Sequence, residues 1–310
     1  MKEVPHISIV SPVYKAEKIL EKLVDEIQRV MCQMNVTYEI ILVDDRSPDN
    51  SWEVMQQLSS KFSEVKSLRL SRNFGQHPTI MAGLSEAKGE WIVVMDCDLQ
   101  DQPKEIVKIY NKAIEGFDIV LARRENRKDG FFKKLASKIY TIIFNYLADI
   151  HFNNEIANFG IYNKKVIDAV LQIGDHIKAF PLFVNHVGYQ STSIAVEHAD
   201  RYSGTSSYSL SKSMSLAFNA IISYSNKPLK IFVKFGMLIS FLAFIGGIIN
   251  IYLYLEDRIK VSGYSSIIIS LWFLSGIIIT VVGVVGIYVG KVFEQTKNRP
   301  TYIIDKIIKN

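Results

Sequence analysis

A run of apolar, strand-forming residues, Trp91–Met95, leads directly into the acidic and amide side chains of Asp96, Asp98, Gln100 and Asp101. Continuous apolar runs of this length are typical of strands buried on both faces of a parallel sheet. In open α/β sheets, ligands bind just beyond the carboxyl ends of such strands. The run therefore predicts a buried strand of an α/β domain with a ligand site at its end.

The carboxylates of Asp96 and Asp98 would repel one another at that position unless a cation neutralised them. Oxygen ligands are those that Mg²⁺ and Mn²⁺ prefer, and these metals commonly hold substrate phosphates as well. We therefore expect Asp96 and Asp98 to bind a divalent metal. Asp101, close before Pro103, is explained equally well as a helix cap.

Strand and helix patterns alternate between His6 and Arg124. Strands are expected at His6–Ser11, Tyr38–Val43, Val65–Leu70, Trp91–Met95 and Asp118–Leu121, and helices at Ala16–Met34, about 51–62, Pro78–Ala87 and Pro103–Glu115. Alternation on this scale predicts a mostly parallel, doubly wound sheet.

Polar residues follow the expected strands at each carboxyl end. They are Ser11–Tyr14, Asp44–Asp45, Ser71–Asn73, Asp96–Asp98 and Arg123–Arg124. One edge of the sheet therefore collects carboxylates, guanidinium groups and an aromatic ring, as a nucleotide-phosphate site requires.

Two uncharged apolar stretches near the end of the chain, Phe235–Leu255 and Val261–Gly290, predict membrane spans. They cover 21 and 30 residues, and about 18–20 are enough to cross a bilayer. The linker Glu256–Lys260 is too short for a domain, so the spans, about 233–255 and 264–289, form a hairpin whose ends face one compartment.

Basic residues flank the expected hairpin on both sides and predict its orientation. They are Lys227, Lys230 and Lys234 before it, and Lys291, Lys297 and Arg299 after it. The positive-inside rule places these flanks, with both termini, in the cytoplasm. Residues 201–310 hold 12 Lys and Arg against 4 Asp and Glu, a net charge of +8, whereas the first 200 hold 24 against 27, a net of −3. Because the basic half adjoins the spans, its charge favours anionic lipid over nucleic acid.

The two cysteines, Cys32 and Cys97, form no disulfide framework and fit a reducing cytoplasm.

Segments 131–147 and 212–225 mix cationic and bulky apolar residues. Each is either a helix in the headgroup layer or an amphipathic helix packed on its own domain. The expected organisation is a catalytic domain at 1–210, a juxtamembrane helix at 211–230, two transmembrane helices within 231–290 and a cytoplasmic tail at 291–310.

Five segments resemble the family-2 glycosyltransferases, in the branch that includes dolichyl-phosphate mannosyltransferases and bacterial undecaprenyl-phosphate glycosyltransferases. They are Ser11–Tyr14, Glu39–Ser47, Leu70–Gln76, Asp96–Pro103 and Arg201–Tyr208. The resemblance implies a GT-A fold that moves one sugar, with inversion, from a nucleotide-sugar to a polyprenyl phosphate at the cytoplasmic face of the inner membrane. A UDP-sugar is the favoured donor.

The resemblance also implies roles for particular residues. Pro12, Tyr14, Asp45, Arg72 and Asp96 would bind the nucleotide, Asp96, Asp98 and Gln100 would bind Mg²⁺ or Mn²⁺, and Asp98, Arg123 and Arg201 would act in catalysis, the arginines on phosphates. The chain departs from the family at Ala16, where many relatives have an acidic residue, and at Asn158–Gly160, where bacterial relatives usually read Asp-Phe-Arg. Asn158 is therefore either a sugar or phosphate contact or part of a structural turn.

Two other functions are compatible with the sequence: a polysaccharide synthase on the same fold, and a non-catalytic membrane adaptor with a degenerate transferase domain. Processive synthases carry a Gln-x-x-Arg-Trp segment, and none of the three Trp residues here follows an Arg. Retention of Asp96, Asp98, Gln100 and Arg201 argues against the adaptor. The sequence does not identify the oligomeric state, although two hairpins from a homodimer would pack more readily than one.

Overall fold

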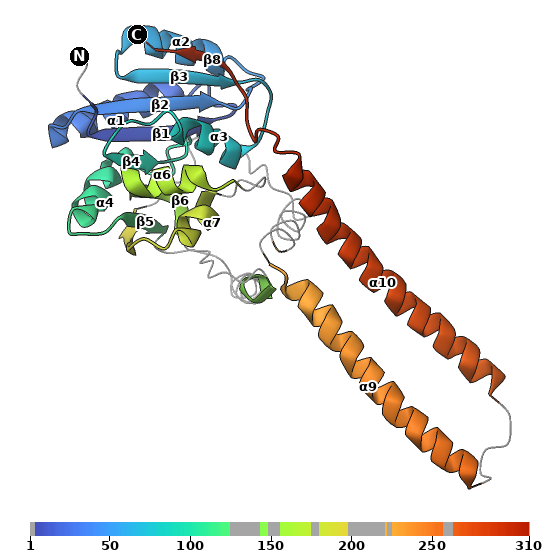
Figure 1. Cartoon of the computed structure of the whole chain (residues 1–310). Helices are drawn as coiled ribbons and strands as arrows, with labels where there is room; N and C mark the ends of the chain where they lie inside the picture. The colour runs from blue at the N-terminus through green and yellow to red at the C-terminus, as the bar shows by residue number, and fades with distance from the viewer. Residues whose placement is uncertain are drawn as a thin grey trace. The chain divides into compact units, whose positions relative to one another are not determined.

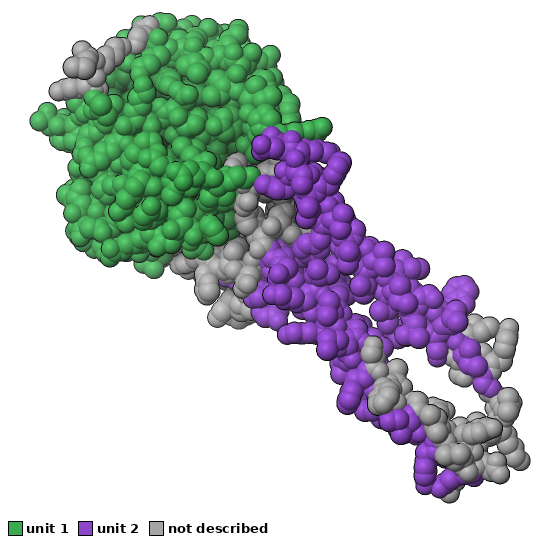
Figure 2. Space-filling view, viewed as in Figure 1, with its two compact units in different colours: residues 1–137, 152–207, 299–310 green, residues 138–151, 208–298 purple. Residues whose placement is uncertain are grey.

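The structure is a computed structural model that describes residues 4–124, 143–147, 156–174, 180–197, 221, 225–256 and 263–309. The chain divides into two compact units, shown in different colours in Figure 2. The first unit comprises 1–137, 152–207 and 299–310, and the second comprises 138–151 and 208–298.

The first unit is built on one eight-stranded sheet, in the order β7-β5-β6-β4-β1-β2-β3-β8 (Figure 1). The strands are β1 (Ile7–Val13), β2 (Tyr38–Asp44), β3 (Val65–Leu70), β4 (Trp91–Val94), β5 (Ile119–Arg124), β6 (Ile156–Asn163), β7 (Ser191–Val196) and β8 (Ile304–Ile308). β1 pairs in parallel with β2 and β4, β2 with β3, and β5 with β7, whereas β6 and β8 run antiparallel to their neighbours. The predicted mostly parallel α/β sheet is confirmed.

Helices cover both faces of the sheet. They are α1 (Leu20–Met34), α2 (Ser51–Lys61), α3 (Gln76–Leu84), η1 (Pro103–Glu105), α4 (Ile106–Ala113), α6 (Lys164–Gln172) and α7 (Phe180–His186). α1 packs beside α2 and α4, and α3 beside α6 and α7. Ile9 belongs to the core cluster with α1, whereas the side chain of its neighbour Val10 lies against Gly83 of α3. Because successive strand residues point to opposite faces, the two helix groups lie on opposite faces of the sheet.

Close packing against the sheet explains the glycine in α3. A Cβ added to Gly83 would lie 2.4 Å from Cγ1 of Val10 and 3.0 Å from Cγ2 of Val43. Only a residue without a side chain lets the helix approach β1 and β2 this closely. The contact matters for function because α3 begins at the carboxyl edge of the sheet.

The end of the chain forms β8, an edge strand that the sequence did not predict. β8 pairs antiparallel with β3, and the backbone N–H of Ser71 donates to the carbonyl of Ile303 at 2.9 Å. Ile308 packs, partly buried, against the core cluster. Part of the segment expected to be a cytoplasmic tail is therefore a strand of the sheet in the first unit.

The second unit contains two long helices, α9 (Lys227–Leu255) and α10 (Tyr264–Thr296). The hydroxyl of Tyr288 in α10 donates to the carbonyl of Ser225, just before α9, at 2.8 Å. Among the described residues one segment, Ser270–Thr296, is long and apolar enough to cross a membrane, where the sequence predicted two. The predicted span at about 233–255 falls in α9, and the two-helix membrane hairpin stays a prediction.

Several predicted features lie outside the described residues. Of 131–147 only 143–147 are described, and they are helical. Of 211–230 the structure describes 221 and 225–230. Arg201 also lies outside the described residues, and its role stays a prediction.

Candidate active site at the carboxyl edge of the sheet

The topology brings the predicted strand-end residues to one edge. β1 to β4 run parallel to one another, and β5 runs parallel to β4 because each is antiparallel to β6 between them. Their carboxyl ends therefore share an edge, where Tyr14, Asp45, Arg72, Asp96 and Arg123 all lie. Tyr14 is 45% exposed, and Arg72 and Arg123 are also exposed. Pro12, by contrast, is buried within β1.

Asp44, at the end of β2, is a structural carboxylate. It is fully buried, one of its oxygens accepts the backbone N–H of Ser47 at 2.8 Å, and the other lies 3.2 Å from Nε of Arg69. The guanidinium of Arg69 lies over the ring of Trp52. Burial raises the pKa of Asp44, which the contacts with Ser47 and Arg69 partly offset. Because Asp44 is buried and both of its oxygens lie against protein groups, it is not accessible to a ligand.

Asp45 ties the end of β2 to the loop that precedes α3. Its two oxygens accept the backbone N–H groups of Phe74 at 2.7 Å and Gly75 at 2.9 Å. Burial raises the pKa of Asp45, and the hydrogen bonds from Phe74 and Gly75 partly offset that rise. Asp45 is only 4% exposed. The predicted nucleoside ligand thus also holds a loop of the site in place.

Asp96 lies half-buried just beyond β4, between two side-chain amides. Nε2 of Gln76 donates to its Oδ1 at 2.7 Å, and the side chain of Asn158 also forms a hydrogen bond with it. Burial, followed by the charges of Asp101 and Asp98, raises the pKa of Asp96 to about 6. Burial is the main cause of this rise, and the neighbouring carboxylates of Asp101 and Asp98 add to it.

Asp98 and Gln100 form a tight turn after Asp96. The backbone N–H of Gln100 donates to Oδ1 of Asp98 at 3.1 Å, and Leu99 between them has a left-handed backbone, with φ of 57°. The described residues contain no group of three or more His, Cys, Asp or Glu side chains arranged to hold a metal. Mg²⁺ is commonly bound by only one or two carboxylates together with substrate phosphates, so the donors present fit such an ion.

An aromatic and cationic rim surrounds the exposed part of the edge. Nζ of Lys15 lies 5.5 Å from the centre of the Tyr14 ring, and Cζ of Arg72 lies 4.1 Å from the centre of the Phe74 ring. Tyr14 directly follows β1, and Phe74 lies in the loop between β3 and α3, so each of these two segments carries a cation beside an aromatic ring.

Sequence reasoning assigned no role to Gln76 and left Asn158 open between a ligand and a turn. The structure places both side chains on Asp96. The sequence offered one signal for Gln76: it directly follows Gly75 and begins a helix soon after a strand ends, which places it near the site. What the sequence could not supply was the strand order that brings these segments to Asp96.

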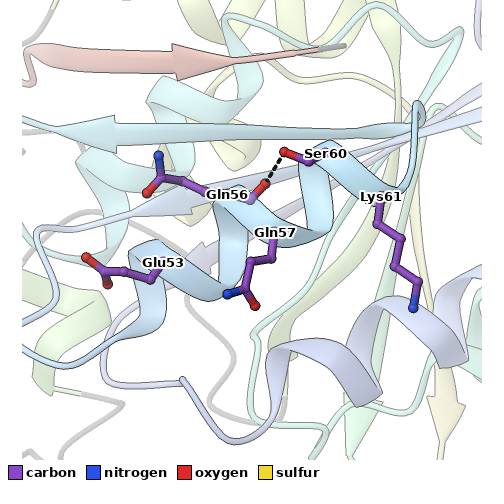
Figure 3. A pocket seen from close by; sticks show the side chains of 5 residues that line it. All are labelled: Glu53, Gln56, Gln57, Ser60 and Lys61. Carbon is purple, nitrogen blue, oxygen red and sulfur yellow. Dashed lines mark hydrogen bonds between the residues drawn. The ribbon is translucent and has the colours of Figure 1, made fainter.

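A separate open hollow of about 620 Å³ runs along α2 (Figure 3). Its lining residues all come from that helix: Glu53, Gln56, Gln57, Ser60 and Lys61. None of the predicted site residues lines it, so it is distinct from the strand-end site.

A doubly wound sheet with carboxylates, cations and aromatic rings along its carboxyl edge is typical of α/β enzymes that bind a nucleotide. The model of glycosyl transferase family 2 matches residues 8–171. The chain belongs to glycosyl transferase family 2 and is a glycosyltransferase, which favours the enzyme over the non-catalytic adaptor.

Relatives match over nearly the whole chain. An uncharacterised glycosyltransferase of Bacillus subtilis, YkcC, is 34% identical over 300 residues, covering 96% of this chain and 93% of the relative. The undecaprenyl-phosphate 4-deoxy-4-formamido-L-arabinose transferase of Proteus mirabilis is 31% identical over 305 residues, covering 97% and 94%. The expected resemblance to polyprenyl-phosphate glycosyltransferases is thereby confirmed.

A solved structure supports the fold. Mannosyl-3-phosphoglycerate synthase from Rubrobacter xylanophilus aligns with a TM-score of 0.50 at 14% identity, covering 84% of this chain and 78% of that one. This likeness confirms the GT-A-like α/β architecture.

Proposed function

We propose that this protein transfers one sugar from a nucleotide-sugar, most simply a UDP-sugar, to a polyprenyl phosphate such as undecaprenyl phosphate, with inversion at the anomeric carbon. The observation that carries this proposal is the near full-length similarity to a transferase whose name specifies undecaprenyl phosphate. The strand-end site and the apolar helix Ser270–Thr296 support it independently.

The acceptor's chemistry fits the site. A polyprenyl phosphate is anionic at neutral pH, so its oxygen attacks without a general base. Asn158, where bacterial relatives usually have Asp, can then serve a different purpose, and here it bonds to Asp96. The harder task is stabilising charge on the departing nucleoside diphosphate.

Asp96, Asp98 and Gln100 would hold a divalent cation, Mg²⁺ or Mn²⁺. When bound, that ion supplies positive charge for the donor's diphosphate. Arg123 is exposed at the end of β5. Arg123 and Arg201 are both proposed to add a guanidinium to the same phosphates.

The nucleoside is proposed to bind between the ends of β1, β2 and β3. Tyr14 and Arg72 offer an exposed ring and an exposed guanidinium, and Pro12 shapes the backbone beneath Tyr14. A carboxylate such as Asp45 can accept the imide N–H of uracil through lone pairs that the loop amides leave.

The catalytic unit is proposed to face the cytoplasm, anchored to the inner membrane by two spans. Cys32 is exposed at the end of α1 and offers a test. In a Cys97→Ala background, Cys32 should resist a membrane-impermeant maleimide in intact spheroplasts and react after permeabilisation. Reaction in intact spheroplasts would place the unit on the other face.

A donor panel tests the proposed reaction directly. Full-length protein in detergent is incubated with undecaprenyl phosphate, Mg²⁺ and each of several radiolabelled nucleotide-sugars. The proposal predicts that one donor yields label in an organic-soluble lipid bearing a single sugar. A growing water-soluble polymer would instead identify a polysaccharide synthase, and absence of transfer from every donor would contradict both.

A further inference from the structure

We propose that Gln76 and Asn158 are positioning residues: a pair of neutral amides that orients the Asp96 carboxylate toward a divalent cation without neutralising its charge. This inference rests on the proposed function, because it concerns the metal that the transferase would bind. Neither residue is assigned a contact with the metal or the substrate.

The first amide reaches Asp96 from α3. Gln76 is the first residue of this helix, and its Nε2 lies 2.7 Å from Oδ1 of Asp96. This is a short hydrogen bond between a neutral donor and a carboxylate. It spans 20 residues of sequence and joins the β3–α3 connection to the end of β4.

The second amide reaches Asp96 from the neighbouring strand. β6 runs antiparallel to β4, with Val94 opposite Gly160. Continuing this register by two residues on each chain brings Asp96 opposite Asn158, whose side chain forms a hydrogen bond with the carboxylate. Asp96 is thus held from two different segments.

The position of Gln76 is itself tightly specified. Gly75 has a positive φ of 93°, a conformation that favours glycine, and its backbone N–H donates to Asp45. The hydroxyl of Thr79 donates to the carbonyl of Gly75 at 2.8 Å. The side chain of Gln76 therefore projects from a backbone fixed on both sides.

The two side chains that bond to Asp96, those of Gln76 and Asn158, are both uncharged. Lysine or arginine at either position would also orient a carboxylate, but it would cancel the negative charge that attracts a cation. An amide supplies the hydrogen bond and leaves the full charge on Asp96. Groups that orient metal-binding side chains in this way typically change metal affinity about 10–100-fold when removed.

Mn²⁺ binding to the full-length protein in detergent, with UDP present, tests the inference without any turnover. Free Mn²⁺ is measured by electron paramagnetic resonance for wild type, Gln76→Leu, Gln76→Lys and Asn158→Ala. The matched control is Gln57→Leu, an exposed glutamine on α2 that lines the separate hollow (Figure 3). Thermal unfolding without metal is recorded for each variant.

Gln76→Leu and Asn158→Ala should bind Mn²⁺ about 10–100-fold more weakly than wild type, and Gln57→Leu should bind like wild type. Gln76→Lys separates orientation from charge. It keeps a donor for Asp96 and should unfold no earlier than wild type without metal, yet it should lose Mn²⁺ affinity at least as much as Gln76→Leu. If Gln76 and Asn158 had a structural role alone, Gln76→Leu and Asn158→Ala would unfold earlier than wild type and still bind Mn²⁺ with wild-type affinity.

Failure of this inference is distinguishable from failure of the proposed function. If wild type binds Mn²⁺ and the substitutions at Gln76 and Asn158 leave that affinity unchanged, the inference is overturned and the proposed metal stands. If wild type binds no more Mn²⁺ than Asp98→Asn, the proposed metal site fails, and the inference fails with it.

Discussion

Arg46 and Asp305 form an ion pair between residues 259 positions apart, with Nη1 of the arginine 3.1 Å from Oδ2 of the aspartate. Arg46 directly follows Asp45, and Asp305 belongs to β8, which pairs with β3. The end of the chain therefore contacts a loop at the carboxyl edge of the sheet. β8 is held by strand pairing, by apolar packing and by this pair, and these contributions can be separated.

Removing apolar packing from β8 should cost more stability than removing the ion pair. Ile308→Ala deletes a partly buried side chain from the core and should lower the free energy of unfolding by about 1–2 kcal/mol. Asp305→Asn should lower it by less than about 1 kcal/mol, because the two side chains are 45% and 40% exposed. Urea unfolding of the two variants compares them. A larger loss in Asp305→Asn would show that the ion pair, rather than packing, retains β8.

Asp45→Asn should loosen the loop before α3. The amide keeps one acceptor where the carboxylate has two, so Phe74 or Gly75 loses its hydrogen-bond partner. A loss of about 2 kcal/mol of local stability corresponds to roughly 30-fold faster hydrogen exchange. Exchange measured by mass spectrometry on a peptide covering residues 70–76 reports the change. Unaltered exchange there would mean that other contacts hold the loop.

Gly83→Ala should destabilise the catalytic unit by about 1–3 kcal/mol, because the added methyl group meets Val10 and Val43. Gly174→Ala is the matched control, since nothing lies within 4 Å of a Cβ at that exposed glycine. Thermal unfolding should show a lower midpoint for the first variant only. Equal midpoints would indicate that α3 shifts away from β1 at little cost.

Asp98→Asn should reduce kcat for sugar transfer by roughly 10²–10³, the usual effect of losing one contact that stabilises leaving-group charge. Its thermal midpoint should stay close to that of wild type, because Asp98 is half-exposed at a turn. Asp168→Asn, which removes an exposed partner of Lys164, serves as the control and should transfer sugar normally. Near-normal turnover by Asp98→Asn would refute its assignment as a metal ligand.

Local sequence patterns predicted β1 to β4 and the helices between them to within a few residues, because apolar periodicity and turn residues are local signals. β5 runs on to Arg124, beyond the predicted end at Leu121. β8 was missed because its five residues become a strand only through pairing with β3, far away in sequence. Long-range pairing of this kind leaves little local signature.

The sequence predicted which residues lie at the site but not the hydrogen bonds between them. Asp45, Asp96 and Arg123 follow strands, so their common edge could be inferred from the alternation of elements. The hydrogen bonds from Gln76 and Asn158 to Asp96 depend on which strands are neighbours. Strand order cannot be read from periodicity, and these contacts required the structure.

The most direct test is sugar transfer by metal-stripped protein. Wild-type enzyme is treated with EDTA, desalted and supplied with undecaprenyl phosphate and the labelled nucleotide-sugar found active, with and without added Mg²⁺ or Mn²⁺. The proposed mechanism predicts that organic-extractable label appears only when a divalent ion is restored. Full-rate labelling of the lipid without any added ion would contradict it.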